Sequence, residues 1–514
     1  MDAFVNVTNT IDDVMYTYFL VFLLIGAGIY FTIRTKGVQF TRIKDMFKVI
    51  TEKKHVEGEK SVSSFQAMMV STASRVGTGN IAGVATAIAV GGPGAVFWMW
   101  IMALINGASA FVESTLAQIW KVRGENGEFH GGPAYYIHQA LGKRWLGIIF
   151  AVCLILCFAI GFNGLQAYNM TSSLEYFYNQ GHLDIVVGHS GVISYFDTQI
   201  PLVIGILLAV AFAFVLFGGT HRISFLTSAI VPVMAILYLV LAVIMAIMNA
   251  GVLPDVFGLI FSEAFNFGSI VGGFAGSMIV QGIKRGLFSN EAGMGSAPNA
   301  AASASVSHPA KQGLVQTLSV FIDTILICTC SAVMIMIFVQ GHIELTPFGG
   351  MADGLTNMPL VQQSMLFTFG DAGIIFMTVA IFAFAFSSLI GNYFYAEQNF
   401  RFITKNKKAL VVFRIVCALS VLYGATSNLT LAWNLADIFM GLQATVNIVV
   451  ILILGKWAFA ALDDYKAQRA KGLDPVFVAD DFPGMPPTEC WHETREELHD
   501  VDDSIGFSAL IDDD

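Results

Sequence analysis

A polar, glycine-containing stretch interrupts an apolar run near residue 75, and it could present backbone groups to a ligand. Its sequence is Ser74-Arg75-Val76-Gly77-Thr78-Gly79-Asn80. If this stretch leaves the helix, it frees N–H groups at the positive end of one half-helix and C=O groups at the negative end of the other. A carboxylate suits the N–H groups near Thr78, Gly79 and Asn80, and an ammonium group or Na⁺ suits the carbonyls.

A second glycine cluster lies in a later apolar run, at Gly268, Gly272, Gly273, Gly276 and Gly282. Each glycine costs about 1 kcal/mol relative to alanine inside a helix, so the cluster needs a reason. One explanation is close helix packing through small residues, for which Gly272 and Gly276 have the right spacing. The other is an unwound segment lining a cavity, because irregular backbone at membrane depth occurs only inside protein or beside water.

Polar side chains in two other apolar segments could complete such a site. Ser387 and Ser388 lie in the middle of an expected helix, and two hydroxyls beside freed carbonyls suit Na⁺, a hard cation that prefers oxygen ligands. Serines within a helix also commonly bond the carbonyl one turn back, so both interpretations stay open. Asn163 and Gln166 could either line the cavity or join neighbouring helices.

Charged residues within the apolar segments are costly and need partners or a function. For Arg75 the cost on insertion scales is about 2.5 to 3.5 kcal/mol. It could act as a gate below the site, or it could pair with one of three carboxylates, Glu113, Asp323 or Asp437. Asp323 and Asp437 could themselves be ion-coupling carboxylates or partners for Arg75.

The motifs of soluble enzymes do not occur in the sequence. The stretch GTGNIAG has the wrong glycine spacing for a dinucleotide site and follows no strand. The six cysteines show no metal-ligand spacing, and all ten histidines lie outside the apolar segments, which leaves carboxylates as the groups that could carry protons. We expect no enzymatic activity, no organic cofactor and no nucleic-acid partner.

Composition places the candidate residues in a membrane. The 514 residues are 55% apolar and 12% charged, against roughly 25% charged in a soluble domain. A membrane-spanning helix needs about 20 apolar residues, and several uncharged runs reach that length. The fold class predicted is an all-α polytopic membrane protein with eleven helices, at residues 14–33, 62–90, 94–120, 145–172, 199–217, 223–249, 264–286, 312–339, 372–398, 409–425 and 432–455.

Basic residues fall on alternate connections between these helices. The connections after helices 1, 3, 5, 7 and 9 contain basic residues, and Lys284 and Arg285 are assigned to the connection after helix 7. The loops at 173–198, 250–263 and 340–371, by contrast, contain acidic residues and no Lys or Arg. Arg414 and the C-terminal tail complete the set, so 26 of the 27 Lys and Arg residues lie on one side and Arg75, within the second helix, is the exception. By the positive-inside rule, the N-terminus is outside and the C-terminus is cytoplasmic.

The net charge of −10 belongs to the C-terminal tail, where 15 acidic residues face four basic ones from Asp463 onward. Such a composition is typical of a solvated, largely disordered segment. We expect four parts, which are an N-terminal helix with a basic cytoplasmic loop (1–61), a first five-helix repeat (62–250), a second five-helix repeat (264–456) and an acidic cytoplasmic tail (457–514).

The two glycine clusters occupy corresponding places in the two repeats. They lie in helices 2 and 7, each the first helix of a group of five, and an odd number of helices per group reverses the orientation of the second group. Interrupted helices at such positions indicate an inverted-repeat secondary transporter with its site at the interruptions.

The sequence also resembles a known family, the alanine or glycine:cation symporters, also called the sodium:alanine symporter family. The stretches that carry the resemblance are VGTGNIAGVATAIAVGGPGAVFWMW (Val76–Trp100), GGPAYYI (Gly131–Ile137) and IKRGLFSNEAGMGSAPNAAA (Ile283–Ala302). The resemblance implies a LeuT-type fold, a 5+5 inverted repeat of ten core helices preceded by one extra N-terminal helix. It also implies uptake of alanine or glycine coupled to Na⁺, or sometimes to H⁺.

The resemblance assigns a substrate pocket. It implies that Thr78, Gly79 and Asn80 hold the carboxylate side of the substrate. Gln166 would complete the pocket together with the backbone near Phe274, Ala275 and Gly276.

The resemblance also assigns a sodium site, in which the hydroxyls of Ser387 and Ser388 are joined by carbonyls near Ala73 and Val76. This helix departs from the family at one point. Many members have two threonines and then a tryptophan where this chain has Ser387, Ser388 and Asn392. Loss of the indole enlarges or polarises the pocket, so Asn392 becomes a candidate substrate ligand and the identity of the amino acid stays open.

These patterns together predict a secondary active transporter that couples Na⁺ to a small neutral amino acid, alanine or glycine, by alternating access. Its expected location is the plasma membrane, which in a bacterium is the inner membrane, and its expected partners are the amino acid and the lipid bilayer. The alternatives are a proton-coupled carrier of another small or polar amino acid and, in a different class, an ion channel.

Overall fold

The computed structural model describes residues 2–52, 62–124, 127–178, 199–265, 277–340, 342, 351 and 355–492. These residues are mostly helical, with a small antiparallel hairpin of β1 (Val122–Arg123) and β2 (Phe129–His130). The helices up to residue 248 are α1 (Asp2–Met15), η1 (Tyr16–Leu20), α2 (Val21–Arg34), α3 (Val38–Thr41), α4 (Ile43–Ile50), α5 (Ser64–Arg75), η2 (Thr78–Asn80), α6 (Ala82–Gly91), α7 (Gly94–Ile119), α8 (Pro133–Leu141), α9 (Arg144–Ile155), η3 (Leu156–Phe162), α10 (Asn163–Ser172), α11 (Glu175–Tyr178), α12 (Ile200–Leu216) and α13 (Gly219–Met248). The later helices are α14 (Leu253–Glu263), α16 (Met278–Asn290), α17 (Pro298–Ala302), α18 (Pro309–Val320), η7 (Phe321–Cys328), α19 (Thr329–Val339), α20 (Asn357–Phe369), α21 (Asp371–Ile403), α22 (Lys407–Ala425), α23 (Leu429–Ala470) and η8 (Ala479–Asp481).

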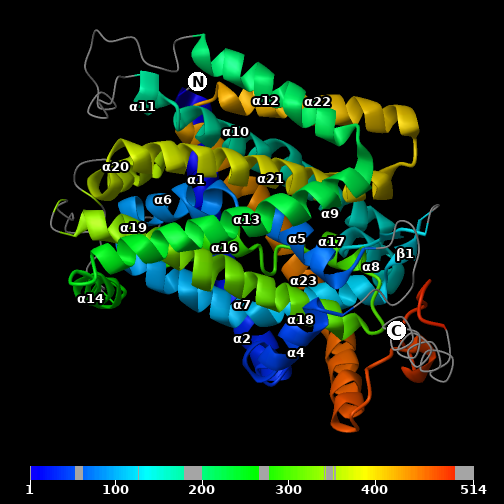
Figure 1. The fold of residues 1–514 in the computed structure, drawn as a ribbon. Coiled ribbons are helices and arrows are strands. Elements are labelled where there is room, and N and C mark those ends of the chain that lie inside the picture. The colour runs from blue at the N-terminus through cyan, green and yellow to red at the C-terminus, as the bar shows by residue number, and fades with distance from the viewer. Residues whose placement is uncertain are drawn as a thin grey trace, which may run out of the picture.

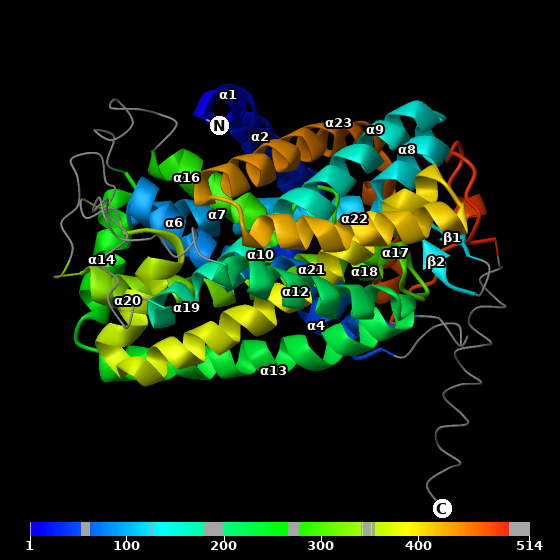
Figure 2. The same cartoon turned by 90° about the horizontal axis from the view of Figure 1, so that it is seen from above.

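The long helices cross the molecule in roughly the same direction. Figure 1 shows this for α7, α13 and α21, and Figure 2 shows α13 and α22 from above. Among the described residues, eight helices are long and apolar enough to cross a membrane. Two further apolar segments are shorter, because α12 has 17 residues and the helix through η2 is interrupted. The predicted count of eleven therefore stays a prediction, while the polytopic helical fold is confirmed.

Apolar side chains cover the outer faces of several helices. On α12, Leu207, Val210 and Phe214 are 64–67% exposed, and on α13 Ile236 and Ile247 are 60% and 71% exposed. A continuous apolar surface of this kind is unfavourable in water and is stable against lipid. The molecule is therefore a multi-pass membrane protein.

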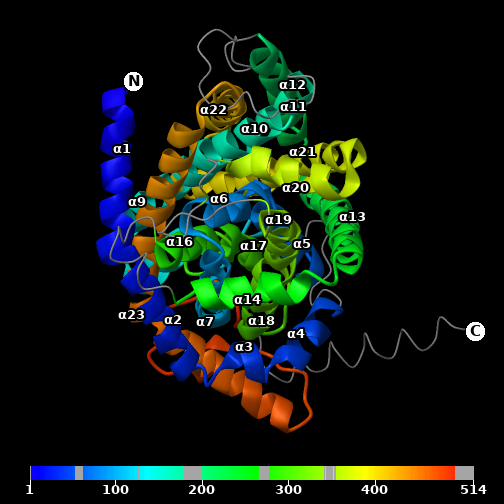
Figure 3. The ribbon, with the colours of Figure 1, turned by 90° about the vertical axis from the view of Figure 1, so that its left-hand side faces the viewer.

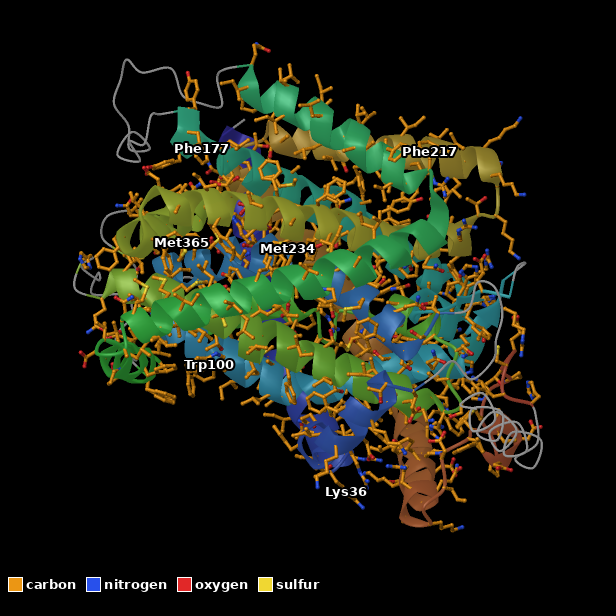
Figure 4. The ribbon with its side chains drawn as sticks, in the orientation of Figure 1. Lys36, Trp100, Phe177, Phe217, Met234 and Met365 are labelled. Atoms are coloured by element: carbon orange, nitrogen blue, oxygen red, sulfur yellow. The ribbon has the colours of Figure 1, made fainter. Side chains whose placement is uncertain are left out.

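Figure 4 shows how the ends of the helices alternate. Phe177 of α11 and Met365 of α20 lie toward the left, whereas Phe217, between α12 and α13, lies toward the right. Phe177 and Met365 belong to connections predicted on one side of the membrane, and Phe217 is the last residue of a helix predicted to end on the other. The alternation agrees with the predicted connectivity.

The first helix of the first repeat is interrupted where the sequence predicts. A capping box between Ser63 and Gln66 starts α5, and α5 ends at Arg75. Val76, with ψ 84°, and Gly77, with φ −137° and ψ −149°, then turn the chain out of the helix. A single 3-10 turn follows before α6 begins at Ala82.

The structure describes a second interruption, which was not predicted from the sequence. The cluster Gly268–Gly276 lies in residues 266–276, outside the described residues. Among the described residues, the chain after α16 leaves the helix at 291–297 and resumes as α17. Glu291, Gly293 and Gly295 have φ of +56°, +85° and +81°, a left-handed conformation that favours glycine. Glycines in the motif that carries the family resemblance therefore mark this interruption.

The N-terminal helix lies at the edge of the molecule beside α23, as Figure 3 shows. Asp12 of α1 forms an ion pair with Lys284 of α16, and Asp437 of α23 lies 2.9 Å from Lys284 and 2.5 Å from Arg285. All four side chains are buried. The assignment of Lys284 and Arg285 to a basic connection is therefore wrong. Both lie within α16, where buried aspartates compensate their charges.

The C-terminal part also differs from the prediction that everything after residue 456 is a largely disordered tail. The helix α23 continues to Ala470, and the residues after it fold back against the body of the molecule. Phe477 N–H donates to Ser307 O (2.9 Å), and Trp491 Nε1 donates to Gln118 O (2.9 Å). The prediction rested on the acidic composition of the tail and overlooked its apolar residues Val476, Phe477 and Trp491, which pack in the folded segment. Residues 493–514 lie outside the described part.

Candidate functional site

The interruption after α5 is buried and offers backbone groups of both signs. Residues 73–81 are all buried. Gly77 N–H donates to Arg75 O (2.9 Å) and to Asn80 Oδ1 (3.1 Å), and Thr78 N–H donates to Gln166 Oε1 (3.0 Å). Gln166 of α10 is therefore brought to the unwound segment, as predicted. Gln166 Oε1 thus accepts a hydrogen bond from Thr78 N–H, and a substrate carboxylate could accept a hydrogen bond from the same N–H group.

Close packing explains both glycines of this segment. A Cβ atom at Gly77 would overlap Ser388 Oγ, and one at Gly79 would overlap the ring of Phe288. The neighbouring Gly83, in α6, has only ordinary contacts, with Trp433 at 3.5 Å from the position of a Cβ atom. The glycines at 77 and 79 therefore serve the approach of α21 and α16 to the unwound backbone.

The predicted sodium ligands meet at the end of α5. Ser388 Oγ lies 2.8 Å from Ala73 O and 3.4 Å from Val76 O, and it also lies 3.0 Å from Phe384 O. Ser387 Oγ donates to Phe384 O (2.8 Å), so it forms the bond within its own helix that serines commonly form. The structure thus collects carbonyl and hydroxyl oxygens from α5 and α21, which is the ligand type that Na⁺ prefers.

Asn80 connects the unwound segment to a buried carboxylate. Its Oδ1 accepts from Gly77 N–H, and its Nδ2 donates to Asp323 Oδ1 (2.7 Å) and to Ser289 Oγ (3.1 Å). Asp323 lies in η7, a stretch of π-helix within the longer helix 309–339. Such stretches occur frequently at functional sites, and a second one, η3, precedes Asn163 and Gln166.

Asn392 lies one turn beyond Ser388 and reaches a different group of residues. Ser74 Oγ donates to Asn392 Oδ1 (2.6 Å) and to Glu291 Oε1 (2.9 Å), and Asn392 Nδ2 donates to Asn163 Oδ1 (3.0 Å). Asn392 therefore lies between the two interruptions, in contact with α5 and α10. Among the described residues, its hydrogen bonds do not join it to Thr78 or Gln166.

Aromatic side chains close the site on the side of α16. The ring of Phe288, which contacts Gly79, lies 4.4 Å from Phe162 and 5.2 Å from Trp433, measured between ring centroids. The Arg285 guanidinium lies 3.9 Å from the centroid of Trp433. This stack joins the unwound segment to the buried ion cluster described above.

Arg75 has no ion pair with any described residue, although it is fully buried. Its Nη1 donates to Gln316 O (3.4 Å), while Nε and Nη2 have no partner among the described residues. The predicted pairing is not found, because the three candidate carboxylates bond elsewhere. Asp437 pairs with Lys284 and Arg285, Asp323 bonds Asn80, and Glu113 accepts from Gly293 N–H (3.2 Å) and Gly295 N–H (3.1 Å).

Sequence reasoning missed Phe288 and Ser289, which contact the unwound segment. Both lie in the stretch IKRGLFSNEAGMGSAPNAAA. The sequence feature that could have indicated them is the pair Gly293 and Gly295. These glycines follow a helical run and mark the end of α16, where Phe288 and Ser289 lie. The candidates Phe274, Ala275 and Gly276 lie outside the described residues.

Comparisons with known proteins show what this chain is similar to. A family model described as "Sodium:alanine symporter family" matches residues 1–479. The amino-acid carrier protein AlsT of Bacillus subtilis is 45% identical, over 97% of this chain and 100% of the relative. The probable sodium/glutamine symporter GlnT of the same species is 42% identical, over 96% and 98%. The sodium/alanine symporter AgcS of Methanococcus maripaludis is 37% identical, over 88% and 95%.

The fold is similar to that of a solved structure, MhsT in complex with L-phenylalanine. The two share 16% identity with a TM-score of 0.51, over 79% of this chain and 96% of the other. At this identity the likeness concerns the fold alone. It confirms the predicted LeuT-type architecture.

Proposed function

Since this chain belongs to the sodium:alanine symporter family, a family of transporters and not of enzymes, we propose that it is a Na⁺-coupled symporter of a small neutral amino acid. Alanine and glycine are the proposed substrates. The proposed mechanism is alternating access, in which ion and substrate bind at the unwound segment and the surrounding helices open first to one side and then to the other.

One observation carries the proposal, the meeting of Ser388 Oγ with Ala73 O and Val76 O. The two carbonyls belong to the last turn of α5 and to the unwound segment, and the hydroxyl belongs to a helix of the other repeat. An ion bound among these oxygens would hold α21 against α5, so its binding would depend on the relative position of the two repeats. This dependence is what coupling an ion to a conformational change requires.

The substrate is proposed to bind on the other side of the same segment. The N–H groups of Thr78 and Gly79, together with the amide of Gln166, are the donors for its carboxylate, and Asn80, whose Nδ2 donates to Asp323 and Ser289, holds their backbone in place. Phe288 closes this region and leaves little room, which favours a small side chain. Phe274, Ala275 and Gly276 stay proposed pocket residues, and Asn392 stays a proposed determinant of substrate size or polarity.

The family places the protein in a membrane, and the distribution of basic residues supports the orientation. We propose that the N-terminus is outside and the C-terminus cytoplasmic, in the plasma membrane and, for a bacterium, in its inner membrane. Tags at the two termini, tested for labelling by an impermeant reagent on intact cells, check this orientation. Labelling of the C-terminal tag would contradict it.

The test is transport by the purified protein in liposomes. An inward Na⁺ gradient should drive accumulation of radiolabelled alanine or glycine, and replacing Na⁺ by choline at constant pH should abolish it. A panel that includes glutamine, the substrate in the name of one relative, tests the identity of the amino acid. Accumulation that persists after both the Na⁺ and H⁺ gradients are collapsed would refute symport, and conductance without saturation would indicate a channel.

A further inference from the structure

The inference concerns Asp323, a fully buried carboxylate beside the unwound segment. Its Oδ1 accepts from Asn80 Nδ2 (2.7 Å), and its Oδ2 accepts from Ser289 Oγ (2.5 Å) and Thr324 Oγ1 (2.9 Å). These donors come from three elements, η2, α16 and η7. The carboxylate is therefore held in one place by the residues that also form the wall of the site.

Asp323 has no counter-ion within ion-pair distance among the described residues. The charge of Arg75 acts on it from a distance, but the hydrogen bonds to its side chain all come from the uncharged groups of Asn80, Ser289 and Thr324. By contrast, Asp12 and Asp437 share Lys284 and Arg285. The other titratable groups on the elements around Asp323 do not neutralise it. The only cation among them in the described part of the chain is Lys311 of α18, which pairs with Glu52 and Asp474. The remaining groups are Glu113 of α7, Glu291 after α16, Cys328 of η7 and Cys330 of α19.

An isolated buried carboxylate is unstable unless a cation or a proton neutralises it. The surroundings of Asp323 suit a proton better than a metal ion. Asn80 points its Nδ2 hydrogens at the carboxylate, because its Oδ1 is occupied by Gly77 N–H. At Oδ1 a metal ion would meet these hydrogens instead of oxygen ligands, and at Oδ2 the thiol of Cys328, which lies 3.0 Å from Ser289 Oγ, is a poor ligand for a hard cation.

The hydroxyl of Ser289 can serve both protonation states. It lies within hydrogen-bond distance of Asp323 Oδ2 and also 3.0 Å from Cys328 Sγ. When the carboxylate is ionised, the hydroxyl donates to Oδ2. When Oδ2 carries a proton, the hydroxyl accepts from it and donates to Cys328 Sγ, so no buried group loses its partner in either state.

We propose that Asp323 is the proton-binding group of the transport cycle, and that Asn80 transmits its state to the substrate site. This proposal rests on the proposed symport function. The proton passes from water on one side of the membrane to Oδ2 of Asp323 and leaves to water on the other side. Asn80 bonds both Asp323 Oδ1 and Gly77 N–H. Protonation of Asp323 weakens the bond between Asn80 Nδ2 and Asp323 Oδ1, because a neutral carboxyl group is a weaker acceptor than a carboxylate. Asn80 then shifts, and it moves the backbone at Gly77 that holds the substrate.

The test uses the purified full-length protein in liposomes containing a pH-sensitive dye, with the membrane potential clamped by K⁺ and valinomycin. With an inward Na⁺ gradient, addition of alanine should acidify the lumen for the wild type and leave the lumenal pH unchanged for D323N. The alanine uptake rate of the wild type should change about tenfold for each pH unit beyond its midpoint, and that of D323N should not depend on pH. A D323N variant that keeps the wild-type pH profile and acidification overturns the proposal.

Two further variants keep the test decisive. E113Q removes another buried carboxylate, one that bonds backbone N–H groups, and should keep the wild-type pH profile. S289A removes a donor to the ionised form, so the midpoint should move to higher pH by about one unit, which tests the proposal even if D323N does not fold. Na⁺-driven uptake without pH dependence or acidification in the wild type overturns the proton proposal alone, whereas the absence of Na⁺-driven uptake of any amino acid overturns the proposed function and this proposal together.

Discussion

Single side chains decide what the unwound segment can bind. Asn80 holds Gly77 N–H with its oxygen and Asp323 with its nitrogen, and Ser388 holds two carbonyls of the same segment. Both side chains are fully buried, so each lost bond leaves a buried polar group unpaired. Substitutions at these two positions should therefore separate substrate binding from ion binding.

Asn80→Ala should weaken alanine binding about tenfold, because loss of one buried hydrogen-bond partner costs about 1 to 3 kcal/mol. The measurement is equilibrium binding of radiolabelled alanine at saturating Na⁺. Asn434→Ala is the control, since Asn434 bonds Thr8 and Asn9 of the N-terminal helix, away from the site. Equal affinity in Asn80→Ala and the wild type would contradict the assignment of Asn80.

Ser388→Ala should raise the Na⁺ concentration for half-maximal uptake about tenfold, because it removes the hydroxyl that meets Ala73 O and Val76 O. The control is Ser364→Ala, whose buried hydroxyl bonds Leu360 O in its own helix. Na⁺ titrations of alanine uptake give both values. An unchanged Na⁺ dependence in Ser388→Ala would remove the basis of the sodium site.

At the scale of elements, two interrupted helices and two π-helical stretches position the site. The sequence predicts the first interruption correctly, because polar residues and glycines within an apolar run are a local signal. The predicted interruption at Gly268–Gly276 lies outside the described residues and stays a prediction. The described chain also leaves the helix at 291–297, which was not predicted.

Gly79→Ala should reduce alanine uptake at least about tenfold, since the new methyl group would overlap the ring of Phe288 and force α16 away from the unwound segment. Gly83→Ala, four residues later, is the matched control, because its methyl group would have ordinary contacts and alanine favours the helix. Uptake assays on both variants, normalised to protein in the membrane, give the comparison. Loss of uptake in both variants would indicate a general effect of the added methyl group.

At the scale of the whole molecule, the chain after α23 is part of the fold. Trp491 packs with Ala67, Ala304 and Val306, and Lys121 Nζ lies 4.4 Å from the centroid of its ring. These contacts join the C-terminal segment to the start of α5 and to the connection between α17 and α18. The segment thus covers the ends of both interrupted helices.

Trp491→Ala should release this segment. The amides of Phe477 and Ala479, which bond Ser307 O and Trp491 O, should then exchange hydrogen at least about tenfold faster, since each 1.4 kcal/mol lost is a factor of ten. Hydrogen–deuterium exchange measured by mass spectrometry gives the rates. Trp145→Ala, at a tryptophan that is 61% exposed, should leave them unchanged. Equal protection in Trp491→Ala would show that the other contacts hold the segment alone.

The candidate site was predicted in part. Gln166, Asn80 and the pair Ala73 and Ser388 are brought together at the first interruption, as the resemblance implied. Phe288 and Ser289 were not predicted, because an apolar ring and a serine at the end of a helix have no distinctive pattern in one sequence. Which residues bind substrate and ion is tested by the experiments above.

The sequence by itself determined that the chain is a polytopic helical membrane protein with an unwound segment near Gly77, because hydropathy and glycine content act along the chain. Only the tertiary structure decided which charges meet. It pairs Lys284 and Arg285 with Asp12 and Asp437, leaves Arg75 without an ion pair among the described residues and folds the C-terminal segment onto the body. The physical reason is that these contacts join residues more than 100 positions apart, and burial makes each charge depend on the partner that packing supplies.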